Sequence, residues 1–437
     1  MLRPEGFKTI LYGFLVGIYL SCPAVVFAEP AVTNDELLMQ IRELKNTVQR
    51  QQQTIESLER RVTTQELTLR AEAAPAQSAG DQLLDGVKIG FESTTIVQAV
   101  RNANGPNQLS NREDATDASM TAKLSFEKSF DDYGSAYVLL KSGPGSGVDQ
   151  ALRLYGNVNN NAIDNSGVLM PEAWYEQHFK RFPLTLTFGK LDATNYIDTN
   201  EYANTDTSQF LSLIFGNSPV IEFPASNGAG VRFSAVPSDL LDVELLAVDS
   251  KAGWTDVFDS MFLAGQVNFK PQLFRRGGNY RLIAWRSGDN HTKWMDTTRD
   301  KENGYGWGVS IDQELTDIFG IFARYGWQDP DVYLNGSDFS LERSWSLGPQ
   351  VKGSLWGRPD DVTGVGFGQI KPSDKYRDAN SLLAKTESHF EWYYNCKVND
   401  HLWISPDLQI IWRPYGKDAA NGDGTIVVTG LRGQVEF

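Results

Sequence analysis

From residue 87 to residue 437 the chain alternates between apolar and polar positions with a period of two residues. In residues 305–315 one face collects tyrosine, tryptophan and aliphatic side chains, whereas the other collects glycine, serine and carboxylates. Residues 389–398 and 402–412 repeat this division. Because successive side chains of a strand point to opposite faces, the pattern predicts β-strands with one apolar and one polar face.

About sixteen segments alternate in this way. They span residues 87–98, 118–129, 134–142, 172–181, 183–190, 228–236, 239–249, 262–270, 278–287, 304–315, 319–327, 346–356, 362–371, 386–398, 402–413 and 425–437. Tight connections at 130–133, 181–183, 237–239, 316–318, 357–361 and 399–400 alternate with long ones, and 271–277 fits this rule least well. A soluble β-sandwich has no reason to place its long connections at one end. We therefore expect an all-β fold, a transmembrane antiparallel β-barrel of about sixteen strands over residues 87–437.

The N-terminus has the features of an export signal. Arg3 and Lys8 precede an apolar run over residues 9–20, which small residues follow. This order predicts that residues 1–28 are a cleaved secretory signal peptide. The run is about twelve residues long, whereas a membrane-spanning helix needs about twenty. Cys22 leaves a lipoprotein signal open as an alternative.

Residues 29–70 have a helical repeat instead of a period of two. Thr33 and Glu36 have the spacing of a helix capping box. A heptad follows, with Ile41, Val48, Ile55, Val62 and Leu69 at one seam position and Leu37, Leu44, Gln51, Leu58 and Gln65 at the other. The narrow stripe predicts a self-associating periplasmic coiled coil, with a single amphipathic helix packed on a domain as the alternative. Residues 71–86, with Pro75, are the expected linker.

Charge and composition exclude several classes of protein. The chain has a formal net charge of -15 and a mean hydropathy of -0.35. This acidity argues against nucleic-acid binding, whose proteins are basic. Loss of Cys22 with the signal peptide would leave Cys396 alone, without an internal disulfide. The sequence has no Gly-x-Ser-x-Gly and no His-Glu-x-x-His, and its four histidines are scattered. We therefore expect no enzyme, no catalytic residue, no metal and no cofactor.

The end of the chain and several internal segments resemble a known family. Phe437 closes an alternating strand, as in the insertion signal of outer-membrane barrels. Residues 188–192, 196–203, 210–211, 325–329, 387–394, 404–409, 413–414 and 431–432 resemble the carbohydrate-selective porin (OprB-type) family. The likeness covers the barrel and not the coiled coil. It implies a homotrimer in the outer membrane of a Gram-negative-type envelope. Members of the family include sugar channels and general porins for ions and small organic solutes.

The pore-lining candidates come from one long connection and from the polar strand faces. The connection at 192–228 is rich in acids and nearly free of bases, and we expect it to be the constriction loop; its acids are Asp192, Asp198, Glu201, Asp206 and Glu222. Inward arginines are expected at Arg232, Arg281, Arg324, Arg413 and Arg432, and inward aromatic rings for sugar stacking at Trp174, Tyr393 and Trp403. Acid opposite base across a narrow lumen orients polar solutes. The alternative is that these charges are solvated or paired with each other.

The expected function is passive diffusion of small hydrophilic solutes, including carbohydrates or ions, through a water-filled barrel. The expected partners are outer-membrane lipid, two further copies of the chain and the solutes, with peptidoglycan or periplasmic components for the coiled coil. A second interpretation is a structural anchor, a barrel plugged by its loops whose coiled coil tethers the outer membrane to the cell wall.

Overall fold

The computed structural model describes residues 86–105, 114–273 and 275–437. The chain divides into two units, Met1–Gln82 and Leu83–Phe437, and every described residue belongs to the second. The predicted signal peptide and coiled coil lie outside the described residues, as does the predicted linker except for its last residue. The fold below is therefore that of the barrel unit.

The described residues form eighteen strands. The first nine are β1 (Val87–Arg101), β2 (Asp114–Phe130), β3 (Gly134–Gly143), β4 (Asn165–Phe179), β5 (Leu184–Leu191), β6 (Gly228–Ser238), β7 (Leu241–Asp249), β8 (Met261–Phe269) and β9 (Gln272–Leu273). The others are β10 (Arg276–Lys293), β11 (Glu302–Thr316), β12 (Phe319–Gln328), β13 (Val332–Leu334), β14 (Leu341–Lys352), β15 (Val362–Pro372), β16 (Glu387–Asn399), β17 (Leu402–Trp412) and β18 (Ile426–Glu436). Because β9 and β13 are short additions, sixteen long strands make up the barrel.

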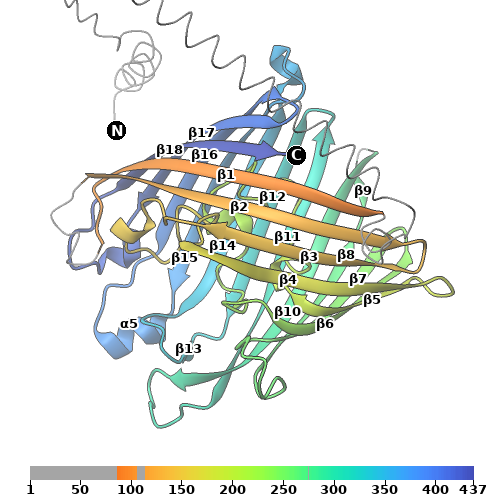
Figure 1. Ribbon diagram of the computed structural model, residues 1–437. Coiled ribbons are helices and arrows are strands. Elements are labelled where there is room, and N and C mark those ends of the chain that lie inside the picture. Colours follow the sequence, from red (N-terminus) through yellow and green to blue (C-terminus); the bar gives the residue numbers. More distant parts are fainter. Residues whose placement is uncertain (1–85, 106–113, 274) are drawn as a thin grey trace, which may run out of the picture. The chain divides into compact units, whose positions relative to one another are not determined.

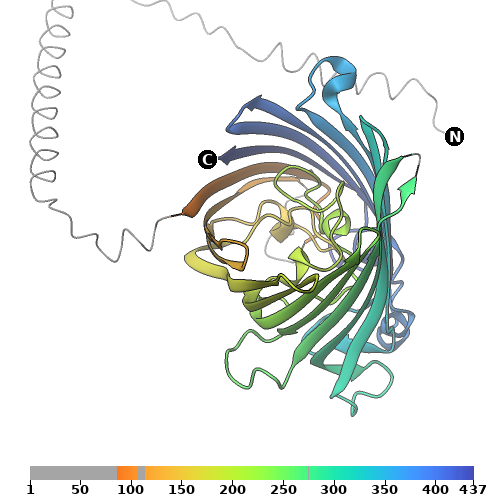
Figure 2. The same ribbon diagram turned by 90° about the vertical axis from the view of Figure 1, so that its right-hand side faces the viewer.

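The sheet closes on itself. β1 pairs antiparallel with β2 on one side and with β18 on the other, where Ile96 lies opposite Arg432. Each remaining long strand pairs antiparallel with its neighbour in the sequence. Figure 1 shows the strands running obliquely around the barrel, and Figure 2 looks along it. Closure pairs the backbone groups that an open sheet edge would leave bare in lipid.

The predicted sixteen-stranded all-β barrel is confirmed, and each predicted segment overlaps one long strand. Most differences lie at the loop-bearing ends, although β14 ends at Lys352 instead of residue 356. β4 begins at Asn165 instead of residue 172, and β10 continues to Lys293 instead of residue 287. The additional residues 165–170 of β4 are all exposed. Backbone pairing continues there without a buried face, so no alternation marks it in the sequence.

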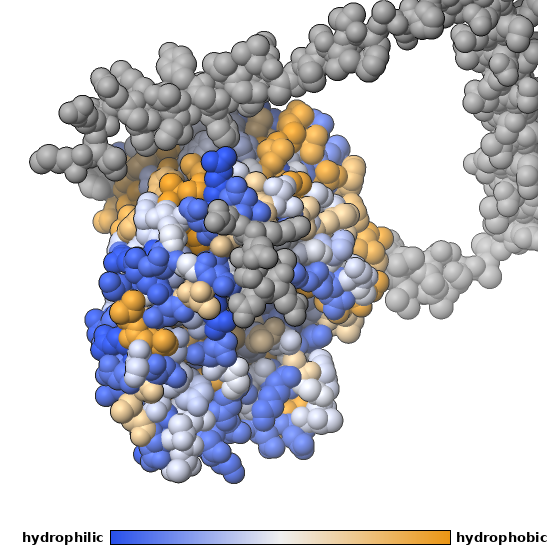
Figure 3. Space-filling model, turned by 90° about the vertical axis from the view of Figure 1, so that its left-hand side faces the viewer, coloured by the Kyte–Doolittle hydropathy of each residue, from blue (hydrophilic) through white to orange (hydrophobic). Residues whose placement is uncertain are grey.

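The two strand faces meet different surroundings. Outward positions hold exposed apolar side chains such as Phe91, Phe188 and Leu282, while inward positions hold buried polar ones such as Gln98 and Glu391. This distribution, apolar outside and polar inside, is typical of a transmembrane barrel. Seen from the end that carries the long loops, the molecule is largely hydrophilic (Figure 3).

Two long connections pack inside the barrel. The β3–β4 loop (residues 144–164) contains the 3₁₀ helix η1 (Asp149–Ala151). The β5–β6 loop (residues 192–227) contains η2 (Ala193–Asn195) and α4 (Leu213–Gly216). Figure 2 shows both loops within the ring of strands.

Three further short helices lie in other connections. They are η3 (Gly353–Trp356), α5 (Asp374–Asn380) and η4 (Pro414–Lys417). Within the described ranges, none of the helices combines the length and the apolarity needed to cross a membrane.

Candidate functional site

The β5–β6 loop is bound to the far wall of the lumen. The Glu391 carboxylate of β16 accepts the backbone N–H groups of Leu211 at 2.5 Å and Ser212 at 3.0 Å. On β11, Asp312 accepts the N–H of Glu201 at 3.3 Å. Asn200 donates to the carbonyl of Ile311 at 3.0 Å. The loop therefore crosses the barrel interior and is attached to strands far from β5 and β6 in the sequence.

A buried ion pair fastens the middle of this loop. The Arg324 guanidinium of β12 lies 3.1 Å from a carboxylate oxygen of Asp198, and both side chains are 1% exposed. Arg324 also donates to the backbone carbonyls of Asp198 and Phe215. The second oxygen of Asp198 accepts the N–H of Ser218 at 2.6 Å. These bonds satisfy both charges inside the protein, so the pair holds the loop and offers nothing to a solute.

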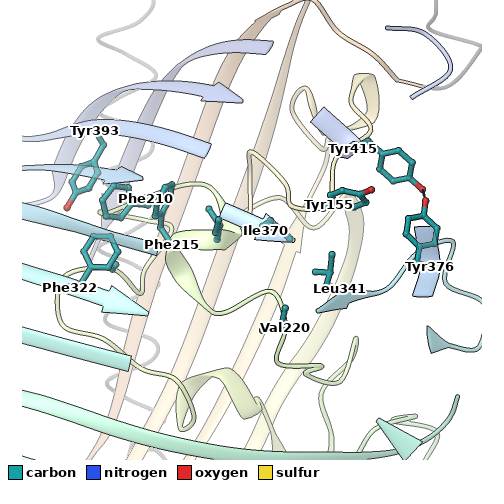
Figure 4. Close-up of a cluster of buried hydrophobic side chains, with 12 residues drawn as sticks. Tyr155, Phe210, Phe215, Val220, Phe322, Leu341, Ile370, Tyr376, Tyr393 and Tyr415 are labelled. Atoms are coloured by element: carbon teal, nitrogen blue, oxygen red, sulfur yellow. Dashed lines mark hydrogen bonds between the residues drawn. The ribbon is translucent and has the colours of Figure 1, made fainter. Parts of the chain in front are cut away.

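Aromatic packing completes the attachment (Figure 4). The Phe210 ring lies 4.8 Å from the ring of Tyr393 on β16 and 5.4 Å from that of Phe322 on β12, both edge to face. Phe215 lies 4.8 Å from Phe210. Such pairs add to the free energy of simple burial, so the loop has a small core of its own against the wall.

The β3–β4 loop is attached to a neighbouring part of the wall. Gln98 of β1 and Gln409 of β17 each donate to the Val158 carbonyl at 2.9 Å. The Glu387 carboxylate of β16 accepts the N–H groups of Tyr155 and Tyr415. Because Tyr415 belongs to the β17–β18 connection, Glu387 joins two loops to one strand.

Charge burial also marks this loop. Asp149 accepts the N–H of Val158 at 2.9 Å. Burial raises the pKa of the Asp149 carboxyl to about 6, although the hydrogen bonds from Val158 and Asn159 act in the opposite direction. The loop is therefore held in a place where water solvates a carboxylate poorly.

One side of the lumen stays accessible to water. Inward side chains on β16, from Glu387 to Asn395, are all buried. On β1 and β2, the side chains of Glu92 and Lys123 are 40% and 26% exposed and form an ion pair at 3.3 Å. Beyond this pair the inward side chains of the two strands, such as Gln98 and Thr121, are buried. Partly exposed inward side chains continue on β3, β4 and β6 with Tyr137, Lys141, Trp174, Glu176 and Arg232. The water-accessible part of the barrel is therefore a strip of inward side chains between Glu92 on β1 and Arg232 on β6.

Acids and bases face each other across this accessible side. Lys141 of β3 interacts electrostatically with Asp206 and Asp192 of the β5–β6 loop and with Lys123. On β4, Glu172 accepts hydrogen bonds from the Trp174 indole at 3.2 Å and from the Asn195 amide at 3.1 Å. Lysines on the wall thus oppose carboxylates on the loop.

The five predicted loop acids have different surroundings. Asp192 caps η2 through the Thr194 N–H, and Asp206 accepts a hydrogen bond from the Asn161 side chain. Glu201 is exposed. The remaining two are bound to the wall, Asp198 by Arg324 and Glu222 by His291 of β10, at 2.9 Å. Asp192, Glu201 and Asp206 are therefore the acids that remain accessible.

Each of the five predicted arginines has a protein partner. Arg232 pairs with Glu244 at 2.7 Å and with Glu176 at 3.1 Å, and Arg281 pairs with Asp312 at 2.6 Å. Arg324 binds Asp198, as described above. Arg413 donates to the Ser388 hydroxyl, and Arg432 donates to the carbonyls of Asp206 and Gln209.

The three predicted aromatic residues also have different surroundings. Trp174 lies on the accessible side and stacks on Tyr137 with a centroid distance of 5.2 Å. Tyr393 is fully buried under Phe210. Trp403 of β17 is partly exposed and lies opposite Gln434 and Lys397. Of the three, Trp174 has the surroundings that a sugar-stacking residue needs.

Four residues of the accessible side were missing from the sequence-based candidates. They are Lys123, Tyr137, Lys141 and Glu172. Each has the inward parity of its strand, so the alternation in residues 118–129, 134–142 and 172–181 contains the signal. The alternation does not show the course of the β5–β6 loop, and this course decides which inward residues the loop covers.

Comparison with known proteins agrees with this architecture. The chain matches the family described as carbohydrate-selective porin, OprB family, over residues 88–437. A curated relative, an uncharacterized protein of Aquifex aeolicus (strain VF5), is 24% identical over 227 residues, which are 51% of this chain and 58% of that relative. The match thus spans little more than half of the relative's length.

Two solved outer-membrane proteins share the fold. The high-pH structure of Pseudomonas putida OprB has a TM-score of 0.70 at 16% identity, covering 83% of this chain and 96% of that one. The outer membrane channel DcaP of Acinetobacter baumannii has a TM-score of 0.52 at 13% identity, covering 81% and 98%. The family and the β-barrel fold indicate an outer-membrane location. Because the family match extends over the barrel from β1 to the last residue, the chain belongs to the carbohydrate-selective porin family.

Proposed function

We propose that this protein is an outer-membrane porin through which small hydrophilic solutes, carbohydrates among them, diffuse passively. The solute path runs along the inner face of β1–β6, and the β5–β6 loop is its acidic constriction. The observation that carries the proposal is the contrast between the buried inward face of β16 and the strip of partly exposed inward side chains between Glu92 on β1 and Arg232 on β6. The family and the fold point to a channel and not to an enzyme.

The arrangement of charge favours polar solutes. Lys141 on the wall opposes Asp192 and Asp206 on the loop. A transverse field between such groups aligns dipolar solutes and stabilises them relative to apolar ones. The field acts without a catalytic or tightly bound step, as passive diffusion requires.

The same wall has the groups that a sugar uses. A pyranose ring presents apolar C–H faces and a rim of hydroxyl groups. The stacked rings of Tyr137 and Trp174 offer an aromatic surface, and Lys141 offers a hydrogen-bond donor on the same wall. Few contacts of modest strength let a solute enter and leave, which conduction requires.

Liposome swelling tests this function. Proteoliposomes with the full chain are expected to swell in hexoses and disaccharides, and more slowly as the sugar grows. Absence of swelling in all solutes would contradict the pore. Equal rates for sugars, amino acids and nitrate of matched size would contradict carbohydrate preference but leave a general porin.

A second candidate, the structural anchor, is favoured by the amount of loop inside the barrel. Both inward loops are bound to β16, through Glu387 and Glu391. In this proposal the loops close the barrel and a coiled coil over residues 29–70 tethers the membrane to peptidoglycan or another periplasmic component. A closed anchor shows no steady current in a planar bilayer, which separates the two candidates.

We further propose a homotrimer assembled with the help of residues 29–70. Deletion of residues 29–80 is expected to lower the oligomer size measured by light scattering in detergent. An unchanged size would show that this segment does not assemble the oligomer.

A further inference from the structure

We propose that the outer face of β6–β10 binds a phosphorylated acyl lipid of the outer leaflet, with Arg286 on its phosphate and an acyl chain in the depression beside it. The depression has a volume of about 600 Å³. Outward side chains line it, from Val231 and Phe233 on β6 to Arg286 on β10. The inference concerns the lipid-facing surface and is independent of the solute that passes through the lumen.

Arg286 has no counter-charge among the described residues. It is exposed and lies between Leu263 of β8 and Tyr305 of β11, its cross-strand neighbours. Among the residues that the structure describes, no carboxylate lies within ion-pair distance of its guanidinium. An unpaired charge against hydrocarbon is unfavourable, whereas a lipid phosphate matches the planar donor array of arginine.

The position of Arg286 along the barrel axis allows it to contact a lipid headgroup. Its partner Leu263 lies two residues from Met261, where β8 begins at the loop-bearing end of the barrel. Its other partner, Tyr305, forms an edge-to-face pair with Trp327 at 6.0 Å. Outward tyrosine and tryptophan mark the membrane–water interface. Arg286 therefore lies at the level of the lipid phosphates.

The depression continues from Arg286 toward the hydrocarbon. Gly265 of β8 lies opposite Ala284 of β10 and next to Leu245 of β7. Because Gly265 and Ala284 lack large side chains, the surface is hollowed between Leu245 and the Arg286 stem. A Cβ built on Gly265 would lie 3.4 Å from the Leu245 side chain, an ordinary contact, so the space at Gly265 can be filled.

Charge favours lipid over a second copy as the occupant. The outward residues of the depression include no acid that could pair with Arg286 of a neighbouring copy. A protein interface formed by this face alone would bury the guanidinium without a partner, which is strongly unfavourable. A phosphorylated lipid provides the counter-charge and the apolar chain in one molecule.

Native mass spectrometry of the full chain in nonionic detergent tests the proposal with phosphatidylglycerol, phosphatidylcholine of identical acyl chains, and inorganic phosphate. The wild type is expected to retain phosphatidylglycerol at least fivefold better than phosphatidylcholine. Arg286→Gln is expected to abolish this preference. Gly265→Leu is expected to lower the retention of both lipids severalfold. Arg343→Gln is the matched control, because Arg343 is also an exposed arginine near the loop-bearing end but pairs with Glu342 at 2.8 Å.

Three outcomes would overturn the proposal. They are an unchanged lipid preference in Arg286→Gln, competition by inorganic phosphate as effective as that by phosphatidylglycerol, and a loss of oligomer instead of lipid in both variants. The last would assign the face to a second copy. Heat-modifiable mobility on gels confirms that each variant is folded, so a folding failure is not mistaken for lost binding.

Discussion

Glu387 and Glu391 lie on the inward face of β16, and each carboxylate accepts backbone N–H groups from a different loop. Glu387 binds the β3–β4 and β17–β18 connections, and Glu391 binds the β5–β6 loop. One strand therefore holds three of the loops in place. The carboxylates of Glu387 and Glu391 bind the loops and not the solute.

Glu391→Leu is expected to release the tip of the β5–β6 loop. The substitution leaves the Leu211 and Ser212 amides without their acceptor, at a cost of about 1–3 kcal/mol for each buried group. Single-channel recordings should then show a larger and noisier conductance. Thr95→Val, on the outward face of β1, is the control and should leave the conductance unchanged. A Glu391→Leu channel as quiet as the wild type would mean that this contact does not position the loop.

Arg324→Met is expected to destabilise the barrel by about 3–5 kcal/mol, because it leaves the buried Asp198 carboxylate without its counter-charge. The double variant with Asp198→Asn should recover part of this loss. The measurement is the denaturant dependence of unfolding in detergent. A single substitution that costs less than about 1 kcal/mol would show that water already screens the pair, as it does for surface pairs.

Lys141→Glu is expected to shift ion selectivity toward cations. It replaces the wall base that faces Asp206 and Asp192 with an acid, so the accessible side becomes more negative there. The reversal potential across a salt gradient measures the change. Lys190→Glu on β5 is the matched control, since Lys190 lies opposite Ala173 and Ala229 on the outward parity. Equal shifts in both variants would contradict a path beside Lys141.

The raised pKa of the Asp149 carboxyl predicts that the stability of the folded protein depends on pH. Its folded pKa of about 6 lies above the unfolded value of about 3.9, so the folded state binds the proton more tightly. The stabilisation is complete below about pH 4 and is lost as the pH rises through 6. Relative to Asp149→Asn, the wild type should gain about 1–2 kcal/mol between pH 7.5 and pH 4. Parallel profiles of the two proteins in thermal unfolding would contradict this.

The fold was predictable because a transmembrane barrel repeats one local rule in each strand. Period-two alternation, with tight turns between long connections, located the sixteen long strands, and the terminal strand ending at Phe437 agreed with the same plan. The start of β4 was placed too late because pairing there continues without a buried face. The end of β10 was placed too early because the register shifts between Ser287 and His291, which interrupts the alternation.

The site was only partly predictable. The position of the β5–β6 loop pointed to the lumen, and the alternation pointed to Trp174, whose ring stacks on that of Tyr137. The alternation of inward and outward positions does not show which inward residues a loop covers. The side chains of Arg324, Tyr393 and Lys123 all point into the barrel. Arg324 and Tyr393 are buried under the loop, whereas Lys123 is partly exposed. Contacts between residues more than a hundred positions apart, such as Arg324 with Asp198, decide this, and no local pattern encodes them.

Cysteine labelling during planar-bilayer recording tests whether a water-filled path runs along the inner face of β1–β6. In a Cys396→Ser background, Lys123→Cys places a thiol on the accessible inner face, and Thr95→Cys places one on the outer face. The account predicts steady channels whose current falls when a charged methanethiosulfonate reagent meets Lys123→Cys, with no fall for Thr95→Cys. The absence of steady channels, or a Lys123→Cys current that the reagent does not change, would contradict it.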